Sequence, residues 1–204
     1  MRVIAGTYRS RVLKAPPGMA TRPSSDRLRE TLFNVLAPRI EGASFLDLYA
    51  GSGAVGIEAL SRGAARVVFV ERSPATLHVL RANLESLNLR SAARVHAVSV
   101  GAFLRRTTAA GPKREQYEIL FLDPPYDAAD EYGATLALLG GAAAGLLAEG
   151  AIVIAEHRRK ERLAERVGTL SRTRLLEQGD AALSFYSANA LTPEVPGTPN
   201  KPLE

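Results

Sequence analysis

Apolar residues occur along this chain in short runs that are separated by longer stretches with a helical period. Seven segments predict strands, the last two of them paired in a hairpin: residues 44–49, 66–70, 94–98, 117–122, 150–156, 172–177 and 182–187. Segments 66–70, 117–122 and 150–156 contain continuous apolar runs, which are typical of strands covered on both faces, as in a parallel sheet. Because helical segments separate these strands, the pattern predicts an α/β fold.

The helical segments repeat apolar residues at intervals of three and four positions. They predict helices over residues 25–37 and 54–62 and from Pro74 onward, and an interrupted helix over residues 130–147. Pro74 follows a serine, which is typical of a capped helix start. Residues 158–166 are rich in charge and predict a further helix on the surface.

The two ends of the chain are expected to differ from the main domain. Residues 2–4 and 8–13 predict a β-hairpin, so we expect residues 1–20 to form a small basic arm and residues 21–188 the main domain. Residues 189–204 contain four prolines and are predicted to be disordered.

Positive charge is concentrated near the N-terminus. The net charge is +5, and the first 39 residues contain eight Lys and Arg but only two Asp and Glu. A basic arm beside a nearly neutral domain favours a polyanionic partner, nucleic acid ahead of an anionic membrane surface, although a merely solubilising face also fits. The candidate contacts with nucleic acid are Arg2, Arg9, Arg11, Lys14 and Arg22.

The rest of the composition excludes several kinds of site. The 204 residues, 46% of them hydrophobic, suffice for one main core. The absence of cysteine rules out disulfides, thiolate metal ligands and cysteine nucleophiles. The three histidines lack metal-ligand spacing, and no apolar run approaches the roughly 20 residues of a membrane span. We therefore expect a soluble, cytoplasmic protein without a metal or a membrane partner.

A glycine-rich turn follows the strand at residues 44–49 and opens the next helix. Gly51, Gly53 and Gly56 match the fingerprint of dinucleotide-binding folds, and their position between strand and helix strengthens that match. Glu71 ends the next strand, 20 positions after Gly51, where a carboxylate usually accepts hydrogen bonds from ribose hydroxyls. The sequence therefore predicts a nucleoside cofactor.

Asp47 indicates which nucleoside cofactor this is. A pyrophosphate suits the N-terminus of a helix, but a carboxylate on the preceding strand would repel it. S-adenosylmethionine has no phosphate and carries two cationic groups, so Asp47 favours it over NAD. An alternative role for Asp47 is to fix the amides of the glycine turn. The candidate cofactor contacts are Asp47, Tyr49, Ala50, Gly51, Gly53, Glu71, Arg72 and Ser99.

The apolar run at residues 119–122 ends in a carboxylate, two prolines and an aromatic ring. Ligands of parallel sheets bind at the carboxyl ends of the strands, where Asp123 is expected. Pro124 and Pro125 stiffen the loop and leave its carbonyl groups free to accept hydrogen bonds. Asp123 and the Pro124 carbonyl can then accept both N–H bonds of an exocyclic nucleobase amine, while Tyr126 stacks on the base. This segment is the predicted catalytic site, although a plain acidic turn also fits the four residues.

Taken together, these motifs resemble the bacterial 16S ribosomal RNA (guanine-N2)-methyltransferases of the RsmD type. The resemblance implies a Rossmann-like, class I S-adenosylmethionine-dependent methyltransferase fold, with a seven-stranded, mostly parallel sheet whose last strand is antiparallel. It also implies methylation of guanine N2 in 16S rRNA. It is carried by residues 3–6 with Arg9, Arg11 and Leu13, and by residues 21–27, 32–34, 46–53, 58–64, 69–71 and 122–126.

Two features depart from this resemblance, and other functions stay open. Family members often carry an acidic or amide residue where this chain has Ser99, and the tail after Ser187 is an addition. One alternative is an NAD(P)-dependent oxidoreductase, which the glycine pattern fits and Asp47 opposes. The others are an amino-methyltransferase acting on adenine or cytosine in DNA and a non-catalytic RNA-binding module. We expect a monomer that acts on 16S rRNA, free or in a small-subunit assembly particle.

Overall fold

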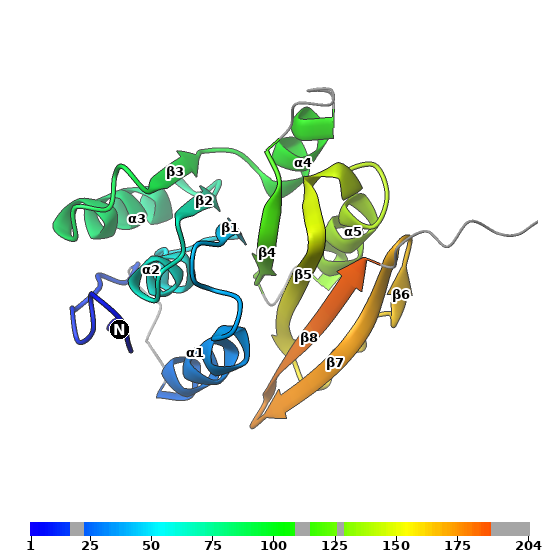
Figure 1. Ribbon diagram of the computed structural model, residues 1–204, viewed down its shortest axis with the longest axis horizontal. Helices are drawn as coiled ribbons and strands as arrows, with labels where there is room; N and C mark the ends of the chain where they lie inside the picture. Colours follow the sequence, from blue (N-terminus) through cyan, green and yellow to red (C-terminus); the bar gives the residue numbers. More distant parts are fainter. Residues whose placement is uncertain (17–22, 109–114, 126–128, 189–204) are drawn as a thin grey trace, which may run out of the picture.

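The structure, a computed structural model, describes residues 1–16, 23–108, 115–125 and 129–188. Its helices are α1 Pro23–Leu36, α2 Ala54–Ser61, α3 Pro74–Ser86, α4 Val100–Thr108 and α5 Ala129–Leu139, with a short 3-10 helix, η1 Ala144–Leu146. A twisted sheet lies between α1, α2 and α3 on one face and α4 and α5 on the other (Figure 1). The predicted α/β fold is therefore confirmed. No helix in these described ranges is long and apolar enough to cross a membrane.

Within the described residues, the sheet has eight strands in the order β3-β2-β1-β4-β5-β8-β7-β6. They are β1 Ser44–Leu48, β2 Arg66–Val70, β3 Ala93–His96, β4 Tyr117–Leu122, β5 Leu147–Arg158, β6 Arg166–Val167, β7 Leu170–Gln178 and β8 Ala181–Ala188. The first five strands in the sheet order, β3, β2, β1, β4 and β5, pair in parallel. Strand β8 runs antiparallel between β5 and β7. The chain order switches between β1 and β4, which is where open α/β sheets bind ligands.

Two sequence predictions near the C-terminal part of the sheet are wrong. The sheet has one strand more than the expected seven, because two residues pair with β7 as β6. Residues 158–166 form a turn and extended chain instead of a surface helix. There the carbonyls of Leu163 and Ala164 accept hydrogen bonds from the side chains of Arg172 (3.2 Å) and Tyr186 (2.8 Å). These tertiary bonds override helix propensity, which is a weak preference.

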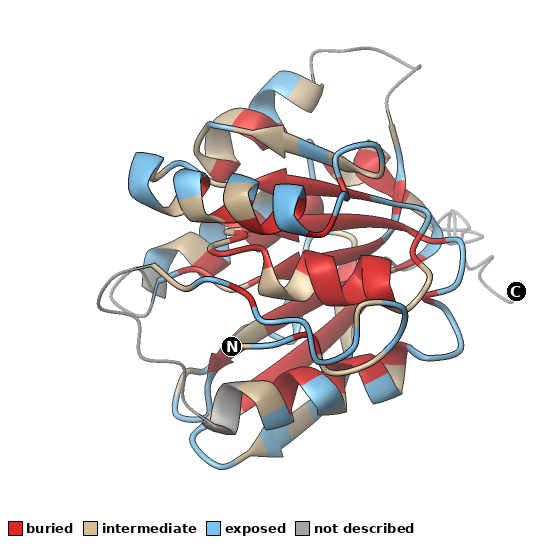
Figure 2. Ribbon diagram, turned by 90° about the vertical axis from the view of Figure 1, so that its left-hand side faces the viewer, coloured by how far each residue is buried: buried red, intermediate tan, exposed pale blue. Residues whose placement is uncertain are grey.

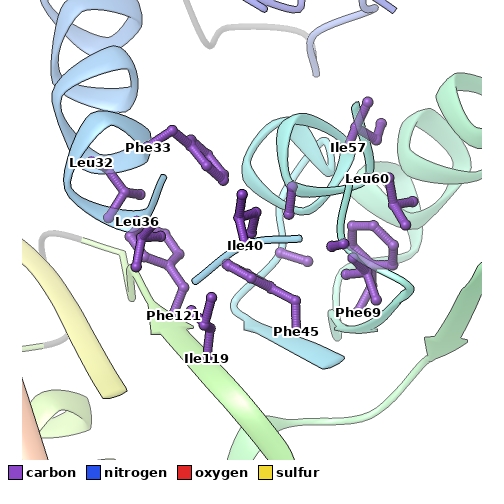
Figure 3. Close-up of a cluster of buried hydrophobic side chains, with 14 of the residues drawn as sticks. Leu32, Phe33, Leu36, Ile40, Phe45, Ile57, Leu60, Phe69, Ile119 and Phe121 are labelled. Carbon is purple, nitrogen blue, oxygen red and sulfur yellow. The ribbon is translucent and has the colours of Figure 1, made fainter. Parts of the chain in front are cut away.

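The core has one half on each face of the sheet, and the buried strands lie between helices with exposed outer faces (Figure 2). Alternate side chains of one strand serve the two halves. Phe45 and Phe121 face α1, α2 and α3, whereas Leu46 and Leu122 face α4 and α5. Phe33 of α1 stacks on Phe45 with ring centroids 6.4 Å apart (Figure 3). This packing holds the strand ends that carry the candidate site.

The N-terminal segment, residues 1–16, lies beside α2 and belongs to the same core (Figure 1). A single bridge between Arg2 and Val12 joins its two halves, in place of the predicted pair of strands. Val3 and Leu13 are buried in the core half under α1, α2 and α3. A two-stranded ribbon alone is only marginally stable, so this burial gives the segment its shape. The described part of the predicted arm is thus built into the main domain.

The helix predicted over residues 25–37 is present as α1, which begins two residues earlier. The predicted C-terminal hairpin is confirmed by β7 and β8. The disorder predicted for residues 189–204 concerns a part of the chain outside the described residues.

Candidate active site

Four acidic side chains meet at the edge of the sheet where the chain order switches. Asp47 lies on β1, Glu71 follows β2, Asp123 follows β4 and Glu156 lies near the end of β5. These strands are parallel neighbours, so their carboxyl ends share one edge. The predicted cofactor turn and the predicted catalytic segment are thereby brought together. Among the described residues, no group of three or more His, Cys, Asp and Glu could hold a metal ion.

The turn between β1 and α2 leaves part of its backbone open to a ligand. Tyr49, Gly51 and Gly53 have left-handed conformations, with φ of 63°, 55° and 83°. A Cβ atom on Gly53 would collide with Leu80 of α3. A Cβ on Gly51 would meet only the Tyr49 carbonyl oxygen, at 3.9 Å. Gly53 therefore permits close packing, whereas Gly51 presents bare backbone that a nucleoside can approach.

Asp47 holds the glycine turn to its helix. Its buried carboxylate accepts a hydrogen bond from the Gly56 amide at 2.9 Å. Burial raises the pKa of Asp47 to about 8, against the lowering effect of the Gly56 N–H, and the charges of Asp123 and Glu71 add to the rise. The hydrogen bond matches the alternative role for Asp47, that of fixing the turn's amides.

Glu71 supports the same turn from the end of β2. Its Oε2 accepts a hydrogen bond from the Gly51 amide at 3.0 Å. Its Oε1 accepts from the amides of Arg72 and Ser73, both at 2.8 Å. The side chain is half-buried and all three donors are backbone groups. One carboxylate is thus placed beside the turn, where the fold would present ribose hydroxyls to it.

The side chains of two other predicted cofactor contacts are directed to α5. The Tyr49 hydroxyl lies 2.7 Å from both Glu131 and Thr135, and burial raises the pKa of Tyr49. The guanidinium of the exposed Arg72 lies 4.0 Å from Glu131. Ala50, by contrast, is buried within the turn. A cofactor contact by Tyr49 or Arg72 would therefore use the backbone or require a change of side-chain partner.

Ser99 caps helix α4, which the sequence pattern did not predict. Its Oγ accepts a hydrogen bond from the Ala102 amide at 3.3 Å. The signal was present, because Val100, Phe103 and Leu104 are buried at helical spacing directly after a capping serine. Contact between Ser99 and an adenine ring stays a prediction.

Asp123 stands at the end of β4 as the sequence predicts. Its side chain is half-buried, Pro124 is buried and Pro125 is exposed. Burial raises the pKa of Asp123 to about 7. Tyr126 lies outside the described residues, so its stacking role stays a prediction. The segment therefore places an acceptor with a shifted pKa at the carboxyl ends of the parallel strands, the ligand edge of the sheet. This combination is common at functional sites.

Glu156 is the site residue that sequence reasoning missed. Burial raises the pKa of Glu156 well above its usual value, the charge of Asp123 raises it further, and Arg29 acts in the opposite direction. The signal was the same as for Asp123, since Glu156 directly follows the apolar run at residues 151–155. Two carboxyl groups therefore stand side by side at this edge.

The described basic residues predicted to contact nucleic acid lie on the N-terminal segment, which passes beside the glycine turn: the Asn83 side-chain amide donates to the carbonyls of both Lys14 (3.0 Å) and Ser52 (2.9 Å). Arg2 and Arg9 line a hollow of about 320 Å³ together with Arg27 and two acidic residues of α1. Arg22 lies outside the described residues. The described members of the set are all exposed: Arg2, Arg9, Arg11 and Lys14.

The chain matches one protein family over nearly all of its described length. The family described as "Conserved hypothetical protein 95" matches residues 1–187. YlbH from Bacillus subtilis is 38% identical over 187 residues, which cover 91% of this chain and 98% of that protein. The chain belongs to this family. Its membership confirms the resemblance inferred from the motifs.

Two further proteins are similar to this chain, and one of them has a solved structure with the same fold. Ribosomal RNA small subunit methyltransferase D from Escherichia coli is 40% identical over 126 residues, which cover 62% of this chain and 60% of that protein. The solved structure of yhhF from Escherichia coli is 37% identical and superposes with a TM-score of 0.78, covering 93% of this chain and 98% of that one. The expected class I methyltransferase fold, with an antiparallel strand within a mostly parallel sheet, is confirmed.

Proposed function

We propose that this protein transfers a methyl group from S-adenosylmethionine to the exocyclic N2 of a guanine in 16S ribosomal RNA. The observation that carries the proposal is the half-buried Asp123 beside the glycine turn, at one edge of the sheet. The name of the Escherichia coli relative, a ribosomal RNA small subunit methyltransferase, supports the class of substrate. Such a substrate implies work in the cytoplasm. We expect the protein to act as a monomer, because one chain supplies every group in the proposed site.

The turn and its carboxylates fit S-adenosylmethionine. When bound, this cofactor supplies an electrophilic methyl group on a sulfonium centre. The bare backbone at Gly51 leaves room for the nucleoside, and Glu71 is placed to accept hydrogen bonds from the ribose hydroxyls. A cation bound at this acidic edge would lower the raised pKa of Asp47 and keep it ionised. The same edge disfavours the pyrophosphate of NAD(P), which argues against an oxidoreductase.

The Glu71→Ala substitution is expected to weaken binding of S-adenosylhomocysteine by about 1.5–3 kcal/mol, the range for hydrogen bonds to a charged group. The measurement is isothermal titration calorimetry on the wild type and the variant. Glu149→Ala is a matched control, because Glu149 is an exposed glutamate far from the turn on β5. Tight binding of NADH together with no response to S-adenosylhomocysteine would contradict the cofactor assignment.

Asp123 and Pro124 have the chemistry to activate a nucleobase amine. The lone pair of such an amine is delocalised into the ring, so it must be oriented towards the methyl group. The Asp123 carboxylate and the Pro124 carbonyl accept its two N–H bonds, and Tyr126 stacks on the base. Asp123 takes up the proton that the nitrogen loses as its bond to carbon forms, and later releases it to water. A pKa near 7 suits this exchange.

Mass spectrometry of modified nucleosides tests the proposal directly. The 16S rRNA of a strain without this gene should lack one N2-methylguanosine that the parent strain contains. The wild-type gene should restore it, and a gene with Asp123→Ala should not. Loss of a methylated adenine or cytosine from DNA instead would identify a DNA amino-methyltransferase. Unchanged modification of both nucleic acids would reject methylation of either substrate.

The exposed arginines of the N-terminal segment are expected to bind RNA phosphates. Removing one phosphate contact lowers the slope of log affinity against log salt by about 0.7–0.9. Replacing Arg2 and Arg9 together with glutamine should therefore lower the slope by about 1.4–1.8. The measurement is a salt titration of RNA binding, with Arg162 and Arg166 replaced in a control, because both are exposed beyond the opposite end of the sheet. An unchanged slope would leave the arginines a solubilising role.

A further inference from the structure

Glu156 lies directly beside Asp123 at the edge of the sheet. Strands β4 and β5 pair in parallel with Leu122 opposite Ala155, so the next residue of each strand reaches the same level. The residues two positions earlier on both strands belong to the core under α1, α2 and α3. Side chains alternate along a strand, so Asp123 and Glu156 continue on that same face. They form a pair of adjacent carboxyl groups on one face of the sheet, at the edge that carries the proposed site.

The Glu156 carboxylate has no hydrogen-bond donor among the described residues. Its backbone carbonyl accepts a hydrogen bond from the Tyr132 hydroxyl at 2.9 Å, which fixes the end of β5. Arg29 acts on Glu156 through its charge, but its Nη2 donates hydrogen bonds to the Arg2 carbonyl (2.7 Å) and the Asp26 carboxylate (3.1 Å). The Glu156 side chain is also partly exposed. Within the described part of the chain, it is therefore a positioned acceptor without a donor.

Guanine has one more donor on its Watson–Crick edge than the proposed function uses. That edge carries the two N–H bonds of N2 and, next to them, the N–H of N1. Asp123 and the Pro124 carbonyl account for the two bonds of N2. An ionised carboxylate only accepts hydrogen bonds, so it needs a donor on the same edge of the base. Burial and Asp123 raise the pKa of Glu156, and an N–H donated to its carboxylate would favour the ionised form against that rise.

We propose that Glu156 accepts the N1–H of the target guanine and thereby selects guanine over the other amino-bearing bases. This inference rests on the proposed function. Adenine and cytosine place an unprotonated ring nitrogen next to their amino group. The lone pair of that ring nitrogen would face the Glu156 carboxylate and repel it. The carboxylate would also lose the N–H donor that guanine supplies. Sites built to hydrogen-bond one group reject analogues that lack it for this reason.

The test uses 16S rRNA substrates in which the target guanine is replaced by 2-aminopurine. This base keeps the N2 amine but has a lone pair at N1 instead of an N–H. The wild type should methylate guanine over 2-aminopurine by on the order of 10²-fold or more in kcat/KM. The Glu156→Gln variant should reduce this preference by about 10- to 100-fold, because its amide can donate to the N1 lone pair. The Glu149→Gln variant, which changes an exposed glutamate far along the same strand, should keep the preference.

Each outcome bears on one proposal. If the wild type methylates no guanine N2, the proposed function fails. If the wild type methylates guanine and 2-aminopurine equally well, only the role of Glu156 fails. This comparison uses the wild type alone, so it does not depend on whether a variant folds. An unchanged preference for guanine over 2-aminopurine, in a Glu156→Gln protein that still binds S-adenosylhomocysteine, also overturns the role of Glu156. A reduced preference together with normal cofactor binding supports the role of Glu156. If Glu156 were purely structural, its replacement would lower the rates on guanine and on 2-aminopurine together.

Discussion

The Asp123→Ala variant is expected to lose methyl transfer by on the order of 10²-fold or more, as when an interaction with the transition state is removed. Asp123 accepts a bond from the reacting amine in the proposed mechanism. The amides of the glycine turn are held instead by Asp47 and Glu71. Affinity for S-adenosylhomocysteine should therefore stay nearly unchanged. Single-turnover kinetics and calorimetry measure the two quantities separately.

The control for this variant is Asp180→Ala, in the exposed turn between β7 and β8, which should retain full activity. The pH dependence gives an independent check. Only the ionised carboxylate accepts a hydrogen bond from the amine, so kcat/KM should fall as the pH drops through about 7, the raised pKa of Asp123. In Asp123→Asn this inflection should be missing. Full activity of Asp123→Ala would mean that backbone carbonyls alone orient the amine.

The ligand edge could be predicted well from the sequence because local patterns encode it. A continuous apolar run marks β2, β4 and β5, and in a parallel sheet the residue after such a run lies at the edge where ligands bind. Asp123 and Glu71 both follow such runs, and the glycines between β1 and α2 mark their turn because its backbone conformation requires them. Glu156 obeys the same rule but lies inside a long strand that continues for two more residues. The sequence nevertheless carried the signal, because the apolar run at residues 151–155 ends directly before Glu156.

What could not be predicted from the sequence depends on contacts between distant residues. The turn after β5 replaces a helix because side chains of β7 and β8 bind its carbonyls. The N-terminal segment resembled a separate hairpin because nothing local links it to residues more than 50 positions away. Glu58, on a helix after a glycine turn, has no distinguishing pattern in the sequence.

Glu58 is a buried charged residue that binds the N-terminal segment to the domain. It is fully buried on α2, and its carboxylate accepts hydrogen bonds from the amides of Ile4 (2.7 Å) and Ala5 (3.0 Å). It also pairs with Arg62 at 2.7 Å and lies 3.9 Å from the Nε of Arg29, an atom that is buried without a hydrogen-bond partner. One carboxylate thus serves two backbone donors and two cations.

The Glu58→Ala substitution is expected to lower the free energy of unfolding by about 3–5 kcal/mol, the cost of removing one partner from a buried ion pair. For a protein of this size, that corresponds to a fall in Tm of about 6–20 °C. The variant removes the acceptor of the Ile4 and Ala5 amides and of the Arg62 guanidinium, and it removes the charge beside Arg29, so it should also release the N-terminal segment, which proteolysis would detect near residues 4–8. Glu85→Ala, which breaks an exposed pair with Arg90, should change the stability by less than about 1 kcal/mol. If both variants unfolded at the wild-type temperature, the burial of Val3 and Leu13 and the hydrogen bonds to Ser61 and Asn83 would suffice to hold the segment.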